Sequence, residues 1–382
     1  MAVSTASTGP FIRAAINGLP PYSAGRSVRD AAGGGAVASD LLGLAANEGP
    51  YGPFPAAAAA AVECVHSANL YPQSGFRSLR GELADFLGVG VERVAVGAGG
   101  IALIHHLSVA LLDEGTTIVT GTPTFHAYAL DARKQGASAR TAPVRLDGGY
   151  DLAAMLELVD DLSRIVYVCN PNNPTGGIVT REELLRFVDA VPESTTVVVD
   201  EAYFEYARST GYPDTIADRA FHRPNLVTLR TFSKAYGLAG LRVAYLVGSP
   251  ALIEAVQKVQ SNYEVTSVAL AAARASLPEA DELARRVELN RAGRATLTEG
   301  LRRFGFPPID SHANFVYAEV GDGKLFAKAL EAEGIIVRPA NAMGDPAGAR
   351  ITVGTPEQVE RTVEALSRVA GHVGPRRGST YR

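Results

Sequence analysis

The chain has 382 residues, a hydrophobic fraction of 47%, a charged fraction of 20% and a formal net charge of -4. This length is comfortable for two domains, and this composition is that of an ordinary globular protein. The slightly negative charge, without a basic stripe in the body of the chain, argues against nucleic acid or a membrane surface as a partner.

Other features of the composition narrow the class further. The two cysteines, Cys64 and Cys169, cannot build a disulfide framework or a cysteine-based metal cluster. The seven histidines follow no metal-ligand spacing, so we expect no metal site. The N-terminal sequence MAVSTASTGP lacks the charged and apolar regions of a signal peptide, and no apolar run approaches the length of a membrane span. We therefore expect a soluble, cytoplasmic protein.

The first two segments of the chain differ in their patterning. Residues 1–44 are weakly patterned, and we expect an N-terminal arm that also forms part of a small domain. From residue 45 to 265, apolar runs alternate with segments of helical spacing, which indicates a large α/β domain. The alternation predicts a mostly parallel sheet with helices on both faces and the carboxyl ends of its strands at one edge. The predicted strands are 94–96, 118–120, 139–143, 165–169, 195–199, 226–229 and 243–247, and the predicted helices are 55–65, 78–87, 101–112, 125–136, 182–190 and 250–260.

The remaining segment, residues 266–382, has longer helical stretches and fewer strands. We predict helices over 268–301, 324–333 and 356–369, and strands over 314–318, 335–337 and 350–353. This pattern indicates a second, smaller α+β domain.

Polar loops leave the ends of several predicted strands. The sequence GAGG over residues 97–100 precedes a helix, whose unpaired N–H groups and dipole attract an anion, although it matches no nucleotide-binding glycine spacing. NPNNPTGG over residues 170–177 combines two X-Pro steps with asparagines, which can aim an amide side chain. DEAY over residues 200–203 places a carboxylate at a strand end, where it can cap a helix or pair with a cationic ring nitrogen.

A fourth loop, TFSKAYGLAGLR over residues 231–242, contains Lys234 among hydroxyls, small residues and the cation Arg242. A solvated turn with one surface lysine would account for this loop alone. However, lysine is almost never fully buried unless it is paired or functional. The setting also suits a lysine that forms a Schiff base opposite an anionic ligand.

The four loops together predict the features of one ligand. Lys234 requires an aldehyde, and Asp200 requires a protonated ring nitrogen. The ligand also needs a ring hydroxyl and a phosphate, for which the candidate partners are Tyr203, Asn173, the amides of residues 99–101, Ser233 and Arg242. These requirements describe pyridoxal 5′-phosphate.

The order of NPNNPTG, DEAY and TFSKAYGLAGLR resembles that in the fold-type-I pyridoxal-phosphate-dependent aminotransferases of class I/II. The resemblance is greatest to the histidinol-phosphate and aromatic aminotransferase branch. It extends from FIRAAINGLPPYSAGRS and LAANEGPYGP to RITVGTPEQ near the C-terminus. It implies a seven-stranded, mostly parallel sheet in a cofactor-binding large domain, a ping-pong amino-group transfer to and from 2-oxoglutarate/glutamate, and a homodimer.

The resemblance also implies roles for single residues around the cofactor. Lys234 would carry the cofactor covalently and move a proton, and Asp200 would keep the pyridine nitrogen protonated. Asn173 and Tyr203 would bond to the ring hydroxyl, and Phe125 would stack on the ring. The implied phosphate contacts are Gly99, Gly100, Ile101, Thr231, Ser233 and Arg242.

Further matches concern the substrate and the partner subunit. Tyr71 matches a tyrosine that reaches the phosphate across the dimer interface, and its alternative reading is a surface aromatic. Arg350 matches an arginine that binds a substrate carboxylate or phosphate through a bidentate bond. Arg338 and Tyr22 match further contacts to the substrate anion, and Asn47 matches a position on the substrate side.

Two departures from the family pattern bear on the cofactor and the substrate. Gly100-Ile101 stands where many relatives have Ser or Ala followed by an acidic residue, so one hydroxyl contact to the phosphate is lost. Gln73 replaces the aspartate of the usual Tyr-Pro-Asp. The sequence leaves histidinol phosphate, an aromatic amino acid and a specialised donor open. A decarboxylase, lyase or oxidase on the same scaffold also stays open, while the intact cofactor residues argue against a non-catalytic protein.

Overall fold

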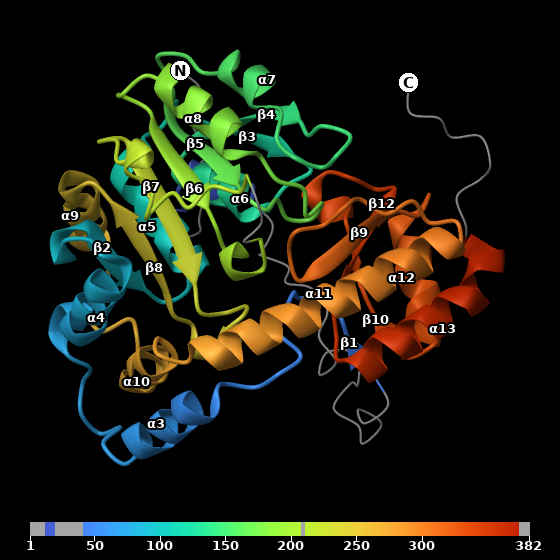
Figure 1. Ribbon diagram of the computed structural model, residues 1–382. Helices are drawn as coiled ribbons and strands as arrows, with labels where there is room; N and C mark the ends of the chain where they lie inside the picture. The colour runs from blue at the N-terminus through green and yellow to red at the C-terminus, as the bar shows by residue number, and fades with distance from the viewer. Residues whose placement is uncertain (1–11, 20–40, 208–210, 374–382) are drawn as a thin grey trace, which may run out of the picture.

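The computed structural model describes residues 12–19, 41–207 and 211–373. A large sheet and a smaller α+β region lie side by side, and the long helix α11 (Ala280–Arg303) extends from the first to the second (Figure 1). Apolar side chains form one core around the large sheet and another within the smaller region.

The large sheet has seven strands in the order β2-β8-β7-β6-β5-β3-β4. The strands from β7 to β4 in this order run parallel, and β8 is antiparallel to both β7 and β2. The predicted α/β fold with a mostly parallel, seven-stranded sheet is therefore confirmed. The strands are β2 (Val94–Gly97), β3 (Thr117–Thr122), β4 (Ser138–Pro143), β5 (Ser163–Cys169), β6 (Thr196–Asp200), β7 (Leu226–Thr231) and β8 (Ala244–Gly248).

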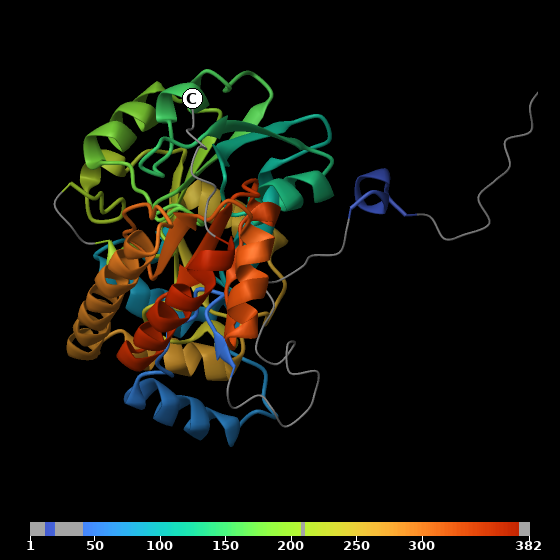
Figure 2. The same ribbon diagram turned by 90° about the vertical axis from the view of Figure 1, so that its right-hand side faces the viewer.

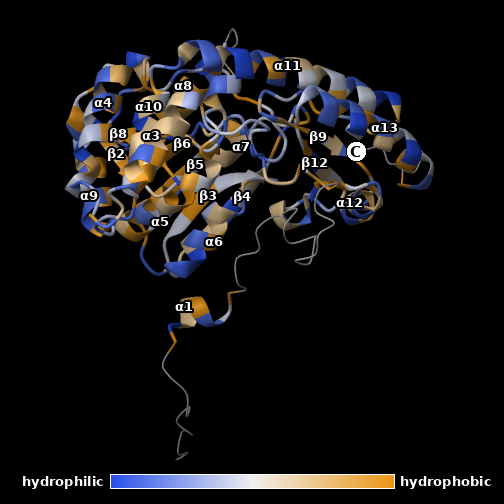
Figure 3. Ribbon diagram, turned by 90° about the horizontal axis from the view of Figure 1, so that it is seen from below, coloured by the Kyte–Doolittle hydropathy of each residue, from blue (hydrophilic) through white to orange (hydrophobic). Residues whose placement is uncertain are grey.

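Strands β6 and β7 are buried along their whole length, since helices cover both faces of the sheet. In β6, with the sequence TVVVD, every residue is buried, as expected for β-branched residues in a parallel sheet covered on both sides. Figure 3 shows apolar segments within the strands and hydrophilic turns on the outer helices. The helices are α3 (Pro55–Val65), α4 (Arg77–Leu87), α5 (Gly100–Leu111), α6 (Ala127–Lys134), α7 (Leu152–Leu156), α8 (Arg181–Ala190), α9 (Pro250–Val259) and α10 (Ser267–Ser276).

The smaller region contains an antiparallel sheet in the order β11-β12-β9 and a parallel pair, β1 and β10. The β1–β10 pair joins residues 42–43 to this region. Helices α12 and α13 cover it, and α1 (Ala14–Asn17) lies at the periphery of the molecule, beside α6 (Figure 2). None of the helices in the described ranges has the length and apolar character needed to cross a membrane. The elements are β1 (Leu42–Gly43), β9 (Phe315–Glu319), β10 (Ile335–Ile336), β11 (Arg338–Pro339), β12 (Gly348–Thr352), α12 (Gly323–Ala332) and α13 (Pro356–Val373).

Two predicted elements are divided in the structure. The helical stretch 268–301 becomes α10 and α11, because Pro278 lies between them and cannot continue a helix. The strand 335–337 becomes β10 and β11, which belong to different sheets. α10 packs on α3 and shares an apolar cluster with β2 and β8 of the large sheet. The domain division at 1–44, 45–265 and 266–382 stays a prediction.

Candidate active site

The predicted cofactor loops meet at one edge of the large sheet. Strands β2, β5, β6 and β7 point the same way, because β8 is antiparallel to both β2 and β7. Their carboxyl ends therefore lie together, where open α/β sheets bind ligands. A cavity of about 530 Å³ lies there. Most of the predicted site residues line it: Asn47, Gly100, Ile101, Phe125, Asn173, Tyr203, Thr231, Ser233, Lys234, Arg242, Arg338 and Arg350.

The amine of Lys234 is set up as a nucleophile. Its side chain is half-buried, and Nζ donates a hydrogen bond to the carbonyl oxygen of Ala46 at 3.3 Å. Burial lowers the pKa of Lys234 to about 7, and the cations Arg350 and Arg242 contribute to the decrease. A large fraction of the amine is therefore neutral near pH 7, as attack on an aldehyde requires.

Asp200 is a buried carboxyl at the end of β6, with 4% of its surface exposed. Its Oδ2 accepts a hydrogen bond from the Tyr128 hydroxyl at 2.6 Å, and its Oδ1 accepts one from the Ala202 amide at 3.1 Å. Burial raises the pKa of Asp200, while the bond from Tyr128 acts against this increase. A cationic ring nitrogen would favour the charged carboxylate further. Sequence reasoning did not identify Tyr128 as part of this site.

Tyr203 and Asn47 form a hydrogen-bonded pair in the cavity wall. Asn47 Nδ2 donates to the Tyr203 hydroxyl at 2.9 Å. The Asn47 backbone amide and side-chain oxygen both bond to the Thr352 hydroxyl, at 3.0 and 3.2 Å. Asn47 therefore orients Tyr203 and links it to β12. Burial raises the pKa of Tyr203, so the hydroxyl stays protonated and can donate to a ligand oxygen.

Arg350 connects the smaller region to the cofactor loops. It lies on β12 with 5% of its surface exposed. Its Nη1 donates to Asn173 Oδ1 at 2.5 Å, and its Nη2 donates to the Ala45 carbonyl oxygen at 2.5 Å. These contacts hold a guanidinium at the cavity wall, beside the loop that carries Asn173.

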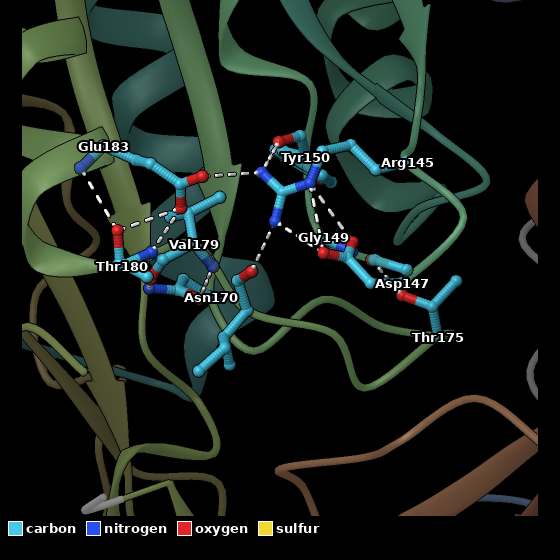
Figure 4. A network of polar contacts seen from close by, with 11 residues as sticks. Arg145, Asp147, Gly149, Tyr150, Asn170, Thr175, Val179, Thr180 and Glu183 are labelled. Carbon is cyan, nitrogen blue, oxygen red and sulfur yellow. Dashed lines mark hydrogen bonds and ion pairs between the residues drawn. The ribbon is translucent and has the colours of Figure 1, made fainter. Parts of the chain in front are cut away.

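A polar network braces the NPNNPTGG loop (Figure 4). The Asn170 side chain exchanges two hydrogen bonds with the backbone of Val179, at 3.2 and 3.0 Å. Arg145 donates to the Ile178 carbonyl oxygen at 3.1 Å and forms an ion pair with Glu183 at 3.3 Å. These bonds fix both ends of the loop, so that Asn173 can be held at the cavity.

The other end of the cavity has the properties of an anion site. Gly99, with φ of +84°, is the N-cap of α5, whose first amides and dipole favour an anion. A Cβ at position 99 would lie 2.4 Å from Arg242 Nη2, so only glycine fits beside this guanidinium. The Thr231 hydroxyl donates to the Ser233 hydroxyl at 3.0 Å. Two hydroxyls, a guanidinium and a helix N-terminus thus gather where a phosphate would bind.

Two further residues at the cavity, Arg338 and His126, are candidates for contact with the substrate. Arg338 on β11 is directly opposite Arg350 on β12, and both line the cavity. His126, which the sequence reasoning did not single out, lines it as well. Burial lowers the pKa of His126, and Arg338 and Arg350 contribute to the decrease. The sequence feature that could have indicated His126 is its position next to the predicted site residue Phe125, in TFHAY.

Some predicted residues lie elsewhere. Tyr71 is 83% exposed and does not line the cavity of its own subunit. Tyr22 lies outside the described residues. Phe125 lines the cavity and makes an edge contact with the Tyr128 ring, with 5.5 Å between centroids. The departures Gly100 and Gln73 are at the cavity wall and before a short 3-10 turn, respectively.

The chemical groups of the site correspond to those that one prosthetic group requires. It offers an amine with a lowered pKa at Lys234 and an anion site near Arg242, both at the cavity. The carboxyl of Asp200 is buried at the end of β6, and it is not among the residues that line the cavity. These groups match the aldehyde, the pyridine nitrogen and the phosphate of pyridoxal 5′-phosphate. The fold and the site therefore define a pyridoxal-phosphate-dependent enzyme.

Comparisons with known proteins specify the family. The family model "Aminotransferase class I and II" matches residues 39–366. A histidinol-phosphate aminotransferase of Geobacillus sp. (strain WCH70) is 39% identical over 359 residues, covering 94% of this chain and 98% of that protein. An aromatic amino acid aminotransferase of Rhodococcus jostii (strain RHA1) is 40% identical over 351 residues, covering 91% and 93%. The crystal structure of a histidinol-phosphate aminotransferase from Sinorhizobium meliloti, in complex with pyridoxal-5′-phosphate, has a TM-score of 0.85 and 26% identity, covering 96% and 99%.

This chain belongs to the class I and II aminotransferase family, and pyridoxal 5′-phosphate is its cofactor. The resemblance inferred from the motifs is thereby confirmed, as is the prediction of an aminotransferase.

Proposed function

We propose that this aminotransferase moves an amino group between histidinol phosphate or an aromatic amino acid and the 2-oxoglutarate/glutamate pair, in a ping-pong sequence. The observation that carries the proposal is the pairing of Arg338 with Arg350 at the cavity. Like charges at directly opposed positions of two strands are destabilising, and a bound anion offsets their repulsion. The candidate donors and 2-oxoglutarate all carry a phosphate or a carboxylate. Relatives of similar identity are named for each of the two donor types.

We assign the chemical roles as follows. When bound, pyridoxal phosphate supplies an aldehyde that takes up the amino group and a ring that accepts carbanion charge. Lys234 would hold the aldehyde when no substrate is present. Its amine, with a pKa near 7, then accepts a proton from the substrate Cα and can return it. Asp200 holds the proton on the ring nitrogen.

The remaining residues bind and orient. Asn173 and Tyr203 would hydrogen-bond to the ring hydroxyl, and Phe125 would pack against the ring. Arg350 and Arg338 would bind the anionic group of the substrate, and Tyr22 is proposed as a further contact to that group. The phosphate is held by the amides of residues 99–101 together with Thr231, Ser233 and Arg242.

We also propose a homodimer in which Tyr71 of one subunit completes the phosphate site of the other. Tyr71 is 83% exposed and stacks on Tyr263, with 4.9 Å between the ring centroids. The neighbouring apolar side chains Val62, Val65 and Leu70 are 65%, 56% and 64% exposed. Such a cluster of exposed apolar side chains is typical of an interface. Sedimentation of the holoprotein should give twice the chain mass, and a monomer that binds the cofactor fully would contradict this proposal.

A half-reaction screen tests the donor. The holoprotein is mixed with one amino donor at a time, and the absorbance band of the lysine-bound cofactor is followed. The proposal predicts stoichiometric pyridoxamine phosphate and a keto product with histidinol phosphate or with phenylalanine and tyrosine. Release of CO₂ or peroxide would instead identify a decarboxylase or an oxidase, and turnover of none of these donors would identify a specialised one. A Lys234→Ala variant, which cannot attach the cofactor, serves as the blank.

The cytoplasmic location expected from the sequence belongs to this proposal as well. Fractionation of the producing cells, with activity measured in each fraction, tests it.

A further inference from the structure

A carboxylate that the proposed chemistry does not use lies beside the turn before α5. Glu264 belongs to the segment between α9 and α10, and its side chain is 12% exposed. Its Oε1 accepts a hydrogen bond from the Ala98 amide at 3.1 Å. Its Oε2 lies 3.2 Å from Nε2 of His106, a buried residue on α5. One side chain thus contacts both the turn before α5 and the helix itself.

The segment between α9 and α10 also contacts the turn before α5 through a second residue, Gln260. Gln260 Nε2 donates to the Val96 carbonyl oxygen at 2.6 Å and to Glu264 Oε1 at 2.8 Å. The carbonyl of Val96 and the amide of Ala98 are therefore both fixed by side chains from outside the sheet. Ala98 immediately precedes Gly99, so these bonds set the direction in which α5 begins.

The charge of Glu264 is compensated locally. Burial raises the pKa of this carboxyl, but the hydrogen bonds from His106 and Gln260 outweigh burial and leave it below its ordinary value. The group is therefore a carboxylate, and charge-assisted bonds of this kind are stronger than neutral ones. An uncompensated carboxylate near an anion site would repel the anion, whereas this one is surrounded by donors.

We propose that Glu264 is a positioning residue for the phosphate of the cofactor: it fixes the turn at residues 97–99 so that the first amides of α5 and Arg242 converge on the phosphate. The geometry at Gly99 makes the site sensitive to this turn, because a Cβ there would already lie 2.4 Å from the Arg242 guanidinium. The inference rests on the proposed placement of the phosphate at residues 99–101.

A role in general stability is the competing explanation, and the phosphate itself separates the two. Pyridoxal has the aldehyde and the ring of the cofactor but no phosphate. A residue that acts through the phosphate turn should change the affinity for pyridoxal phosphate and leave the affinity for pyridoxal almost unchanged. A residue that stabilises the whole fold should change both in proportion.

The experiment titrates the apoprotein with each compound and follows the absorbance of the lysine-bound aldehyde. For Glu264→Ala, Kd for pyridoxal phosphate should rise by about tenfold, the effect of one charge-assisted hydrogen bond, and Kd for pyridoxal by less than about twofold. Glu264→Gln keeps an acceptor for the Ala98 amide and should restore most of the affinity. Equal increases for both compounds, or no increase for pyridoxal phosphate, would overturn the proposal.

A variant at another position keeps the test valid if Glu264→Ala fails to fold. His106→Leu keeps Glu264 and removes its partner on α5, so the preference for pyridoxal phosphate should fall in the same direction by a smaller factor. If Glu264→Ala does not fold, an unchanged preference in His106→Leu would overturn the proposal. If the unaltered protein shows no preference for pyridoxal phosphate over pyridoxal, the placement of the phosphate is wrong. If the unaltered protein prefers pyridoxal phosphate and Glu264→Ala keeps this preference, only the role of Glu264 is wrong.

Discussion

Replacing Tyr128 by phenylalanine tests how the site keeps Asp200 charged. Tyr128 is fully buried and its hydroxyl donates to Asp200 at 2.6 Å, while its ring stacks on Tyr167 with 4.3 Å between centroids. Tyr128→Phe retains the ring and its stacking partner and removes only the hydroxyl. Asp200 then keeps its bond from the Ala202 amide at 3.1 Å.

The size of the effect follows from the charge on the acceptor. A hydrogen bond to a charged group contributes about 1.5–3 kcal/mol, which corresponds to a factor of about 10–100 in an equilibrium or a rate. Burial already raises the pKa of Asp200, and the bond from Tyr128 acts against it. Without this bond the pKa rises further. Asp200 is then a weaker partner for the protonated ring nitrogen, and the ring accepts carbanion charge less well.

Stopped-flow absorbance of the first half-reaction gives the rate, and titration of the apoprotein gives Kd for pyridoxal phosphate. We expect Tyr128→Phe to lower the rate by at least about tenfold and to raise Kd. Tyr167→Phe is the matched control, because it removes a buried hydroxyl from the other ring of the stack, which does not bond to Asp200. A Tyr128→Phe protein as fast as the unaltered one, or an equal loss in Tyr167→Phe, would refute the reasoning.

Three further predictions concern the phosphate, the lysine and the substrate. Gly100→Ser should lower Kd for pyridoxal phosphate about fivefold by adding a hydroxyl, since its Cβ would lie 3.4 Å from the nearest side chain. Gly99→Ala should raise Kd, because of its φ of +84° and the clash at 2.4 Å. The rate at which the apoprotein captures the cofactor should rise with pH through about 7, as Lys234 loses its proton, and then level; a continued rise toward the ordinary lysine pKa would contradict this. Arg338→Gln should raise KM for the anionic substrate with little change in stability. Arg350→Gln should raise KM and also lower stability by about 1.5–3 kcal/mol, because it removes the hydrogen bonds of a buried guanidinium; denaturant unfolding measures the stability of both variants.

Much of the cofactor site could be predicted because its residues occur in contiguous motifs at strand ends. NPNNPTGG, DEAY and TFSKAYGLAGLR each follow a buried strand, and parallel strands bring such loops to one edge. Asn173, Asp200 and Lys234 could therefore be proposed as site residues from local sequence. The alternation of strands and helices predicted the large sheet for the same reason.

The residues that sequence reasoning missed act through distant partners. Tyr128 reads as an ordinary helical aromatic, and its partner Asp200 is 72 positions away. Glu264 reads as a polar loop residue, and its partner Ala98 is 166 positions away. Similarly, the residues 335–337 predict a strand but not that the chain changes sheet beside Arg338. Only the packed fold brings these groups together.

The proposed role of Arg350 would link the binding of the substrate to the residues around the cofactor ring. Its guanidinium occupies the oxygen of the Asn173 amide, at 2.5 Å, which leaves the Nδ2 protons of Asn173 to donate to the ring hydroxyl oxygen. Arg350 is also directly opposite Arg338 in the register of β11 and β12, and both residues line the cavity. An anion that bonds to Arg350 competes with Asn173 Oδ1 for its donors and weakens the constraint on that amide. Because Arg350 also bonds to the Ala45 carbonyl oxygen at 2.5 Å, this competition extends to the segment that carries Ala46, the acceptor of the Lys234 amine. If Arg350 binds the substrate as proposed, this one side chain of β12 would couple substrate binding to Asn173 and to the segment that contacts Lys234.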